Sequence, residues 1–353
     1  MDFALSDEQR MLQESAQRFF VERHPLSRAR LALPWSDYMQ RSLWRDMAGL
    51  GWLGMLASEQ QGGMHLGMCE VFLVAEAAGR QLLNLPFATS VVLLPLLHRA
   101  EGRSAGKLTD LVESVVAGCA SVNVTIDQAA WMDHDGQCSH QLLVRGLYGN
   151  ANEIEWALWP GESATGTAPM TESKTLDSTL RCARLGPWTD TLHRCAEPAW
   201  NVLTIPAKER GLLMACYRMA RIAELLGAAS ATLDQSCVYA RQREQFGKPI
   251  GSYQGIKHQL ANAWMALDNA RLAALYAVAV LDGGQPDWLF ACAAAELTAI
   301  EGCLRMGREA IQIHGGLGFT WEHDAHLYLK RIHHVSAHLG GADVALDLLD
   351  LAI

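Results

Sequence analysis

Helical periodicity over long stretches is the feature that most limits how this chain can fold. From Ala207 onward, apolar residues recur every three to four positions in stretches of more than twenty residues. Helices of this length bury such faces against one another. The face of the first stretch carries Leu212, Leu213, Cys216, Met219, Ala223 and Leu226, and that of the second carries Ile256, Leu260, Ala263, Leu267, Ala270 and Ala274. The pattern therefore predicts a bundle of long helices.

Three more helices are expected after these two. The spacing predicts a third long helix over about 287–310, which Gly315 and Gly316 bring to an end because glycine is common directly after a helix. Shorter helices are expected over about 323–335 and 343–351.

The earlier parts of the chain follow two different periods. From Ser6 to about Ala100 the spacing is helical, with Ser6 placed to cap the first helix. Between about 117 and 205 the period is two, in four short segments that predict strands: 121–126, 141–146, 155–159 and 201–205. We therefore expect a mainly α protein with a small β domain. Its expected domains are an N-terminal helical domain over 1–113, a reduced central β domain over 114–205, and a C-terminal four-helix bundle over 206–353.

Composition argues against several classes of function. The net charge of −9, without long runs of one sign, disfavours nucleic-acid binding. No apolar run is expected to span a membrane, and the acidic start from Met1 to Arg10 is unlike a signal peptide, so we expect a cytoplasmic protein without membrane insertion. The nine cysteines include no Cys-x-x-Cys pair, which favours reduced core thiols over disulfides or zinc ligands.

Two segments carry residues suited to a phosphate-bearing cofactor. The first reads Arg243-Glu-Gln-Phe-Gly-Lys248, in which arginine offers forked donors to phosphate oxygens and phenylalanine offers a face for a ring. The second reads Gln312-Ile-His-Gly-Gly-Leu-Gly318, in which glycines let a pyrophosphate approach the main chain. Taken singly, each feature also has a structural explanation, because paired glycines end helices and most surface arginines are solvated.

Together, at this spacing, the two segments resemble the flavin-contacting segments of the acyl-CoA dehydrogenase family. The stretches from Leu43 to Gly54 and from Arg218 to Gly227 are similar to further parts of that family, so the resemblance covers essentially the whole chain. It implies the fold expected above, FAD as cofactor, α,β-desaturation of an acyl-CoA substrate, electron-transfer flavoprotein as electron acceptor, and a homo- or hetero-tetramer. By resemblance, the residues that reach the FAD of a neighbouring subunit are Arg243, Gln245, Phe246, Gln312, Gly315 and Gly316.

The chain departs from the family at the catalytic base. The glutamate that removes the α-proton of the thioester corresponds here to Leu339, and the alternative position on an earlier helix corresponds to Tyr217, which is a protonated phenol at neutral pH. We therefore assign no catalytic residue. The loop and strand with which family members hold the flavin of their own subunit are not recognisable in the β segment either.

This asymmetry fits a chain that works with a second, different acyl-CoA dehydrogenase subunit. Residues for a neighbour's flavin are kept, whereas the chain's own base is missing. The stretch from Gly318 to Arg331 is similar to that of the two-gene acyl-CoA dehydrogenases of bacterial steroid degradation. We hypothesise that this chain is the base-lacking subunit of such an enzyme.

Three alternatives stay open. The first is a self-sufficient homo-oligomeric dehydrogenase with a displaced base, for which His338 is a weak candidate and Asp343 a second. Another is a non-enzymatic binding protein on the same fold. The last is a metal site, because His334 and His338 have the spacing of a helical metal pair, but they lack a framework of cysteines and carboxylates and we expect no metal.

Overall fold

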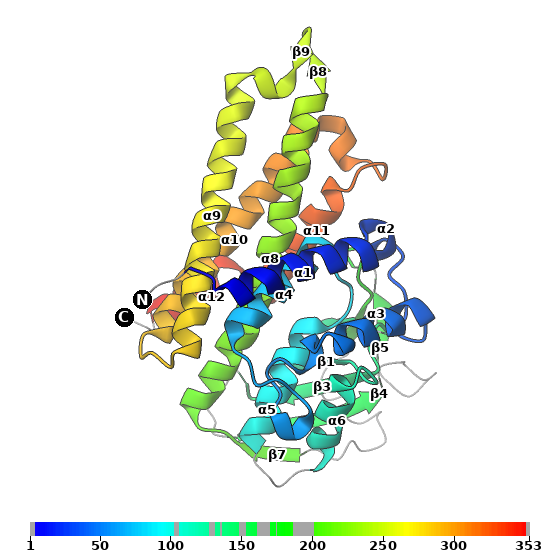
Figure 1. Ribbon diagram of the computed structural model, residues 1–353, viewed down its shortest axis with the longest axis vertical. Coiled ribbons are helices and arrows are strands. Elements are labelled where there is room, and N and C mark those ends of the chain that lie inside the picture. The colour runs from blue at the N-terminus through cyan, green and yellow to red at the C-terminus, as the bar shows by residue number, and fades with distance from the viewer. Residues whose placement is uncertain are drawn as a thin grey trace. The chain divides into compact units, whose positions relative to one another are not determined.

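The computed structural model describes residues 4–101, 106–126, 131–134, 136–147, 153–160, 170–173, 175–185 and 201–350. They form mainly helices, with two small sheets and one short hairpin (Figure 1). The chain divides into two compact units. Unit 1 comprises Met1–Ala29, Met68–Leu83 and Arg218–Ile353, and unit 2 comprises Arg30–Gly67 and Asn84–Tyr217. Both units combine distant parts of the sequence, and the two boundaries between the three domains expected from the sequence stay predictions.

Unit 1 is entirely helical apart from the hairpin. It contains α1 (Asp7–Arg23), α2 (Leu26–Ala29), α4 (Met68–Arg80), α9 (Gln254–Asp282), α10 (Trp288–His314), η6 (Gly315–Phe319), α11 (Ala325–His338) and α12 (Gly341–Asp350). The long helix α8 (Ala207–Gln242) gives residues 207–217 to unit 2 and residues 218–242 to unit 1. The expected bundle of long helices is therefore confirmed, as is the end of the third long helix at Gly315.

The start of α1 follows from its sequence. Ser6 is the N-cap, its side chain accepts a hydrogen bond from the Gln9 amide, and the Gln9 side chain accepts one from the Ser6 amide. This reciprocal pair satisfies two amides that have no partner within the helix. Asp7 and Glu8 place negative charge in the first turn, where the helix dipole favours it.

Helices α4 and α8 cross at two glycines in unit 1. A Cβ atom added at Gly79 would lie 2.1 Å from the Glu224 carbonyl oxygen, and one added at Gly227 would lie 2.0 Å from the Glu76 carbonyl oxygen. Both distances are far below van der Waals contact. The two backbones touch directly, and only glycine fits at either position.

Helix α9 secures α4 from a second side. Both carboxylate oxygens of Asp282, the last residue of α9, accept hydrogen bonds from the amides of Met68 and Cys69 at the start of α4, at 2.7 and 2.9 Å. Further along, the Arg271 guanidinium binds both carboxylate oxygens of Glu76, which is buried. A capping carboxylate and a charge pair thus join segments about two hundred residues apart in the sequence.

Unit 2 packs helices around a small mixed sheet. Its helical elements are α3 (Tyr38–Gly49), η1 (Trp52–Gly54), η2 (Glu59–Gln61), the π-helical turn η3 (Thr89–Leu93), α5 (Leu94–Glu101) and α6 (Gly106–Val116). The first sheet has the order β1 (Val122–Ile126), β3 (His140–Arg145), β4 (Glu153–Pro160) and β7 (Asn201–Thr204), with β1 and β3 parallel and the other pairs antiparallel. These are the four strands expected from the sequence.

Side chains of the turn η3 bind the backbone at the start of β1, the edge strand of this sheet. The hydroxyls of Thr89 and Ser90 both donate to the Val122 carbonyl, at 2.7 and 2.9 Å, and the Val122 amide donates to the Ser90 hydroxyl at 2.8 Å. Nearby, the buried indole of Trp44 donates to the Ala120 carbonyl at 2.7 Å. Side chains of the helices therefore satisfy the backbone where β1 begins.

Two sequence expectations about local structure were incomplete or wrong. A second sheet, with the order β2 (Trp131–Asp133), β6 (Cys182–Leu185) and β5 (Met170–Ser173), was missed, because strands of three or four residues are too short to show a period. A buried position is the default expectation for a tryptophan on an apolar helix, but Trp264 is 58% exposed on α9. Its neighbours at helical spacing, Met265 and Leu272, are exposed as well, so this face of α9 is not covered within the chain.

The cysteines in the described part of the chain are all free thiols. Five of them are buried, namely Cys138, Cys182, Cys216, Cys292 and Cys303. Burial raises the pKa of the Cys303 thiol, which suits an unreactive core position. Cys119 is exposed and two others are half-buried, so the expectation of core thiols holds for most of them but not for all.

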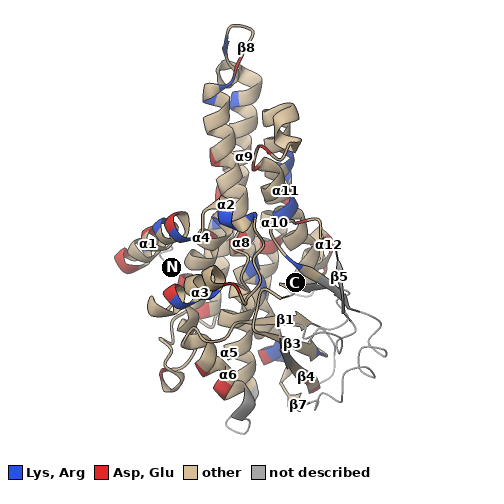
Figure 2. Ribbon diagram, turned by 90° about the vertical axis from the view of Figure 1, so that its right-hand side faces the viewer, with Lys and Arg blue, Asp and Glu red and all other residues tan. Residues whose placement is uncertain are grey.

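One helix has the length and composition of a membrane span, contrary to the expectation from the sequence. An 18-residue window of α9 has a mean hydropathy of 1.3, and 44% of it is buried. Core helices of bundles pass the same test, and a single such helix is weak evidence for a membrane. Basic and acidic residues are interspersed along the described helices (Figure 2).

The glycine crossing generates a test of stability with a matched control. We expect Gly227→Ala to lower the free energy of unfolding by roughly 3 kcal/mol or more, because the new methyl group overlaps the Glu76 carbonyl. Gly302→Ala in α10 would place its Cβ 3.5 Å from the nearest atom, and better helix propensity then offsets any crowding, so we expect a change within about 1 kcal/mol. Urea unfolding of both variants measures the difference, and equal losses would contradict a direct backbone crossing.

Candidate functional site

The first cofactor segment predicted from the sequence forms a tight hairpin between the end of α8 and the start of α9 (Figure 1). The Arg243 amide donates to the Tyr239 carbonyl at 2.8 Å and ends α8. Strands β8 (Glu244–Gln245) and β9 (Lys248–Pro249) then pair antiparallel. The two residues between them, Phe246 and Gly247, have φ of 55° and 81°. Two positive φ values in a two-residue loop define a type I′ turn, which suits the twist of a hairpin.

Phe246 has a left-handed backbone conformation, which is unfavourable for phenylalanine, and its side chain is exposed to solvent. Its side chain is 94% exposed, and a bulky residue in the left-handed region is uncommon. The hairpin is braced from below, since the Tyr253 hydroxyl donates to the Gln245 carbonyl at 3.1 Å and the Lys248 ammonium lies 4.3 Å from the Tyr253 ring centre. Arg243 and Gln245 are exposed beside it. A strained, exposed aromatic residue on a braced turn indicates a contact surface rather than a core contribution.

The second cofactor segment follows the end of α10. Gln312 is exposed in the last turn, and Gly315 ends the helix with φ of 60°. A Cβ atom added at Gly315 or at Gly316 would meet nothing within 4 Å, so the backbone there is open to a ligand. Open amide-bearing backbone and an exposed guanidinium are donors that suit a dinucleotide pyrophosphate. The residues present therefore fit the cofactor that the sequence predicts.

A stack of rings joins the two segments. Tyr239 lies one turn before Arg243, and His314 directly precedes Gly315; their ring centres are 4.5 Å apart. The ring of His323, which follows η6, lies 4.2 Å from that of His314. The structure thus brings together the residues at which the two segments begin, Tyr239 and His314.

The two positions that the sequence resemblance assigns to a catalytic base are occupied by Leu339 and Tyr217. Leu339 is 2% exposed at the end of α11, and Tyr217 is half-buried on α8. The Leu339 carbonyl accepts a hydrogen bond from Arg218 Nη2 at 2.6 Å. Sequence analysis did not single out Arg218, which follows Tyr217 in the chain.

Arg218 is part of a buried ion pair. Its Nε donates to Glu296 Oε2 at 2.8 Å, and its Nη2 binds Glu296 Oε1. Burial raises the pKa of Glu296, while the hydrogen bonds and the charge of Arg218 act to lower it. Glu296 is 1% exposed and both of its carboxylate oxygens bind Arg218, so it is not placed to serve as a base. Arg218 and Glu296 each lie within an apolar stretch of the sequence. A charged residue in such a stretch requires a partner, so this pattern could have indicated the buried ion pair.

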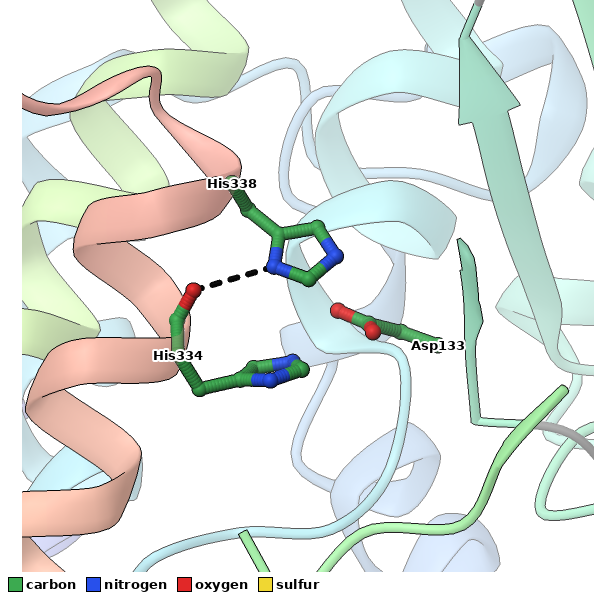
Figure 3. Close-up of side chains that lie close together, drawn as sticks. All are labelled: Asp133, His334 and His338. Atoms are coloured by element: carbon green, nitrogen blue, oxygen red, sulfur yellow. Dashed lines mark hydrogen bonds between the residues drawn. The ribbon is translucent and has the colours of Figure 1, made fainter. Parts of the chain in front are cut away.

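The other titratable candidates lie on α11 and α12. His338 is exposed, and its Nδ1 donates to the His334 carbonyl at 2.9 Å, with the two rings 4.3 Å apart (Figure 3). This bond places the proton on Nδ1 and leaves Nε2 as the acceptor in the neutral ring. Asp343 is exposed in the first turn of α12.

Unit 2 contains a cavity of about 350 Å³ between α5 and the start of α8. Its lining residues are Leu96, Arg99, Ala100, Glu209, Leu212 and Leu213. Glu209, Leu213 and Tyr217 are spaced by four residues, so the cavity and Tyr217 share one face of α8. Three leucines and an alanine line it together with the charged Arg99 and Glu209, and its volume falls in the range of small-molecule sites.

Comparison with known proteins gives this architecture a family. The N-terminal domain model of acyl-CoA dehydrogenases matches residues 6–100, and the C-terminal domain model matches residues 212–350. Among solved structures, the ChsE4–ChsE5 complex from Mycobacterium tuberculosis has the same fold, with a TM-score of 0.79 and 21% identity over 98% of this chain and 97% of that one. The fold is thus that of a flavoprotein dehydrogenase, and the chain belongs to the acyl-CoA dehydrogenase family.

Two relatives from Mycobacterium tuberculosis show how far the similarity extends. The acyl-CoA dehydrogenase IpdE2 is 29% identical over 329 residues, which cover 93% of this chain and 91% of IpdE2. The acyl-CoA dehydrogenase FadE34 is 30% identical over 304 residues, which cover 86% of this chain but only 40% of the longer FadE34. The similarity to IpdE2 therefore spans nearly the whole of both proteins.

The buried ion pair yields a test with an exposed pair as control. We expect Glu296→Gln to lower the free energy of unfolding by about 3 to 5 kcal/mol, because it leaves the Arg218 charge buried without a counter-charge. Arg10→Gln removes an ion pair to Asp7 within α1, where the two side chains are 56% and 90% exposed, and should cost about 0 to 1 kcal/mol. Urea titration compares the two, and a Glu296→Gln protein as stable as Arg10→Gln would contradict the assigned role.

Proposed function

We propose that this chain is the base-lacking subunit of an FAD-dependent acyl-CoA dehydrogenase and that it completes the FAD site of a partner subunit. The assembled enzyme desaturates an acyl-CoA thioester between its α and β carbons. This proposal rests on the family, on the residues that face outward, and on the two vacated positions for the base.

The observation that carries the proposal is a contrast within unit 1. Phe246 stands fully exposed on a strained turn, beside Arg243 and near open glycine backbone, whereas Leu339 is buried and its carbonyl is held by Arg218. The outward residues are arranged to contact something beyond the chain. The position where a base would stand is instead closed by a hydrophobic side chain.

The chemistry explains why a partner is needed. When bound, FAD accepts the hydride that leaves the β carbon. Removal of the α-proton needs a base within hydrogen-bond reach, and neither Leu339 nor the protonated Tyr217 phenol can act as one at neutral pH. In this proposal Arg243 binds phosphate oxygens, Phe246 lies against a ring, Gln245 and Gln312 add polar contacts, and Gly315 and Gly316 offer main-chain amides. The base comes from the partner.

A different subunit is the partner that we favour. The ChsE4–ChsE5 structure is that of a complex between two proteins, and this chain has the fold of that structure over nearly its whole length. The exposed apolar face of α9, with Trp264, Met265 and Leu272, is a further surface suited to burial in an oligomer. We place the assembly in the cytoplasm, with electron-transfer flavoprotein as the electron acceptor.

The cavity of unit 2 supports an acyl-CoA as the ligand class. Its leucines suit an acyl chain, and Arg99 and Glu209 would meet polar groups of that chain. It lies on the same face of α8 as Tyr217, the alternative family position for the base.

The visible absorption spectrum tests the proposal directly. The chain purified alone should be colourless or poor in flavin, and it should gain flavin and acyl-CoA dehydrogenase activity when co-expressed with a family member that carries the glutamate. The flavin-to-protein ratio and the bleaching of the flavin by a panel of acyl-CoA thioesters are the measurements. Flavin-loaded protein that bleaches without any partner would overturn the subunit role, and failure to bind flavin with every candidate partner would favour a non-enzymatic binding protein.

The exposed phenylalanine supplies a sharper version of this test. In the flavin-loaded complex, Phe246→Ala should weaken FAD binding roughly three- to tenfold through loss of a ring contact. The melting temperature of the chain alone should not fall, because the side chain is 94% exposed there. Phe290→Ala, at an exposed position near the start of α10, serves as the control and should leave FAD binding unchanged. Equal effects of the two changes would remove Phe246 from the cofactor site.

A second candidate function is a self-sufficient dehydrogenase in which His338 is the displaced base. The observation in its favour is the bond from Nδ1 to the His334 carbonyl, which leaves Nε2 able to accept a proton. Under our proposal, His338→Gln changes kcat/KM by less than about twofold. A loss of about a hundredfold or more, with an unchanged flavin content, would favour the displaced base instead.

A further inference from the structure

Three rings form a stack at the point where both cofactor segments begin. Tyr239 comes from the last turns of α8, His314 is the last residue of α10, and His323 precedes α11. The Tyr239 and His314 rings are tilted by 31° at 4.5 Å between centres, and the His314 and His323 rings by 46° at 4.2 Å. The ring centres of Tyr239 and His323 lie 6.2 Å apart with their planes at 70°, so the three ring centres form a triangle in which His314 is nearest to both others. His314 is therefore the central ring.

The central ring is buried and neutral. His314 is 3% exposed, and its Nδ1 donates to the Ala310 carbonyl at 2.7 Å, so the neutral ring has its lone pair on Nε2. No described residue gives this Nε2 a hydrogen-bond partner. Burial lowers the pKa of His314, the neighbouring His323 lowers it further, and the bond to Ala310 opposes both. A proton added to His314 would be buried without an anion beside it.

The stack is connected to each segment through the backbone. The Tyr239 carbonyl accepts the hydrogen bond from the Arg243 amide at 2.8 Å, which sets the start of the hairpin. His314 is bonded directly to Gly315, the first open glycine. The hairpin is exposed from Arg243 to Lys248, and in the turn Gly315, Gly316 and Phe319 are exposed, whereas Leu317 is half-buried and Gly318 is buried. A Cβ atom at Gly318 would lie close to His314 and Ile311, so the turn is held on the end of α10, the helix that carries His314.

From these contacts we infer that the Tyr239–His314–His323 stack is a positioning element that couples the 243–249 hairpin to the 315–319 turn, so that both meet one flavin dinucleotide together. Its purpose rests on the proposed function, but the coupling is a property of this chain alone. His314 and Tyr239 are the positioning residues. Neither is a catalytic residue in this inference.

Hydrogen exchange read by mass spectrometry tests the coupling on the full chain. We expect His314→Leu to raise exchange about tenfold in both the 243–249 and the 315–319 segments, while His314→Phe, which keeps a ring in the stack, remains near wild type. His333→Leu, at a half-buried histidine of α11, is the control and should change neither segment. Faster exchange in one segment only, or equal effects of Leu and Phe at position 314, would overturn the inference.

The pH profile gives an independent reading. The groups that face His314 are Tyr239 from α8, His323 from the turn before α11 and the Ala310 carbonyl of its own helix, and η6 has no titratable side chain. Because the folded chain favours neutral His314, the stabilisation is complete above the ordinary histidine pKa and is lost as pH falls below it. Exchange in both segments, corrected for intrinsic rates, should rise about tenfold between pH 7.5 and 5.5 in wild type but not in His314→Phe. The same rise in both proteins would overturn the role of His314.

Addition of FAD to the wild-type chain separates this inference from the proposed function. Protection of both segments by FAD when a glutamate-bearing partner is present, with little protection in the chain alone, supports the two together. If FAD protects neither segment while the variants still show coupled exchange, the proposed function fails and the coupling stands. If FAD protects both but His314→Leu loosens only one, the coupling fails and the proposed function stands.

Discussion

Direct contact between the backbones of α4 and α8 is the constraint on which unit 1 depends. At Gly79 and Gly227 neither helix has room for a Cβ atom. This crossing fixes how α4 lies on the bundle, and the Asp282 cap and the Arg271–Glu76 pair hold the rest of α4 against α9 in that orientation. Tyr328 and Arg331 of α11 then donate hydrogen bonds to the carbonyls of Arg80 and Leu83 at the other end of α4, at 2.8 and 3.0 Å.

The position that other family members give to a base has acquired a structural role here. The Leu339 carbonyl, Arg218 and Glu296 link the end of α11 to α8 and α10 through one guanidinium. Such a buried pair is sensitive to the loss of either partner, so it constrains later change at this position. The backbone at position 339 is therefore tied into the packing of the bundle through Arg218, and the Leu339 side chain itself is buried.

Local rules predicted much of the fold, and tertiary context decided the rest. The long helices, the Ser6 cap, the four strands of the first sheet and the glycine end of α10 all follow from spacing and capping chemistry. The backbone of Phe246 could not be predicted, because phenylalanine has no preference for positive φ, and its place in a type I′ turn depends on the hairpin. Neither the pairing of Arg218 with Glu296 nor the exposure of Trp264 is visible in one helix, since each depends on what packs alongside. The cofactor residues themselves remain predictions carried by resemblance and supported by their exposure.

The discontinuous make-up of unit 1 bears on how the protein is made. Residues 1–29 and 68–83 leave the ribosome early, but the partners of α4 at Gly227, Arg271 and Asp282 are synthesised only after the whole of unit 2. Helix α4 is rich in buried apolar residues, so this surface stays uncovered through most of translation. Nascent chains with such a delay depend on chaperones or on rapid elongation to avoid aggregation. Truncation anywhere before α9 would therefore leave α4 without its cap and expose its apolar face, whatever the condition of unit 2.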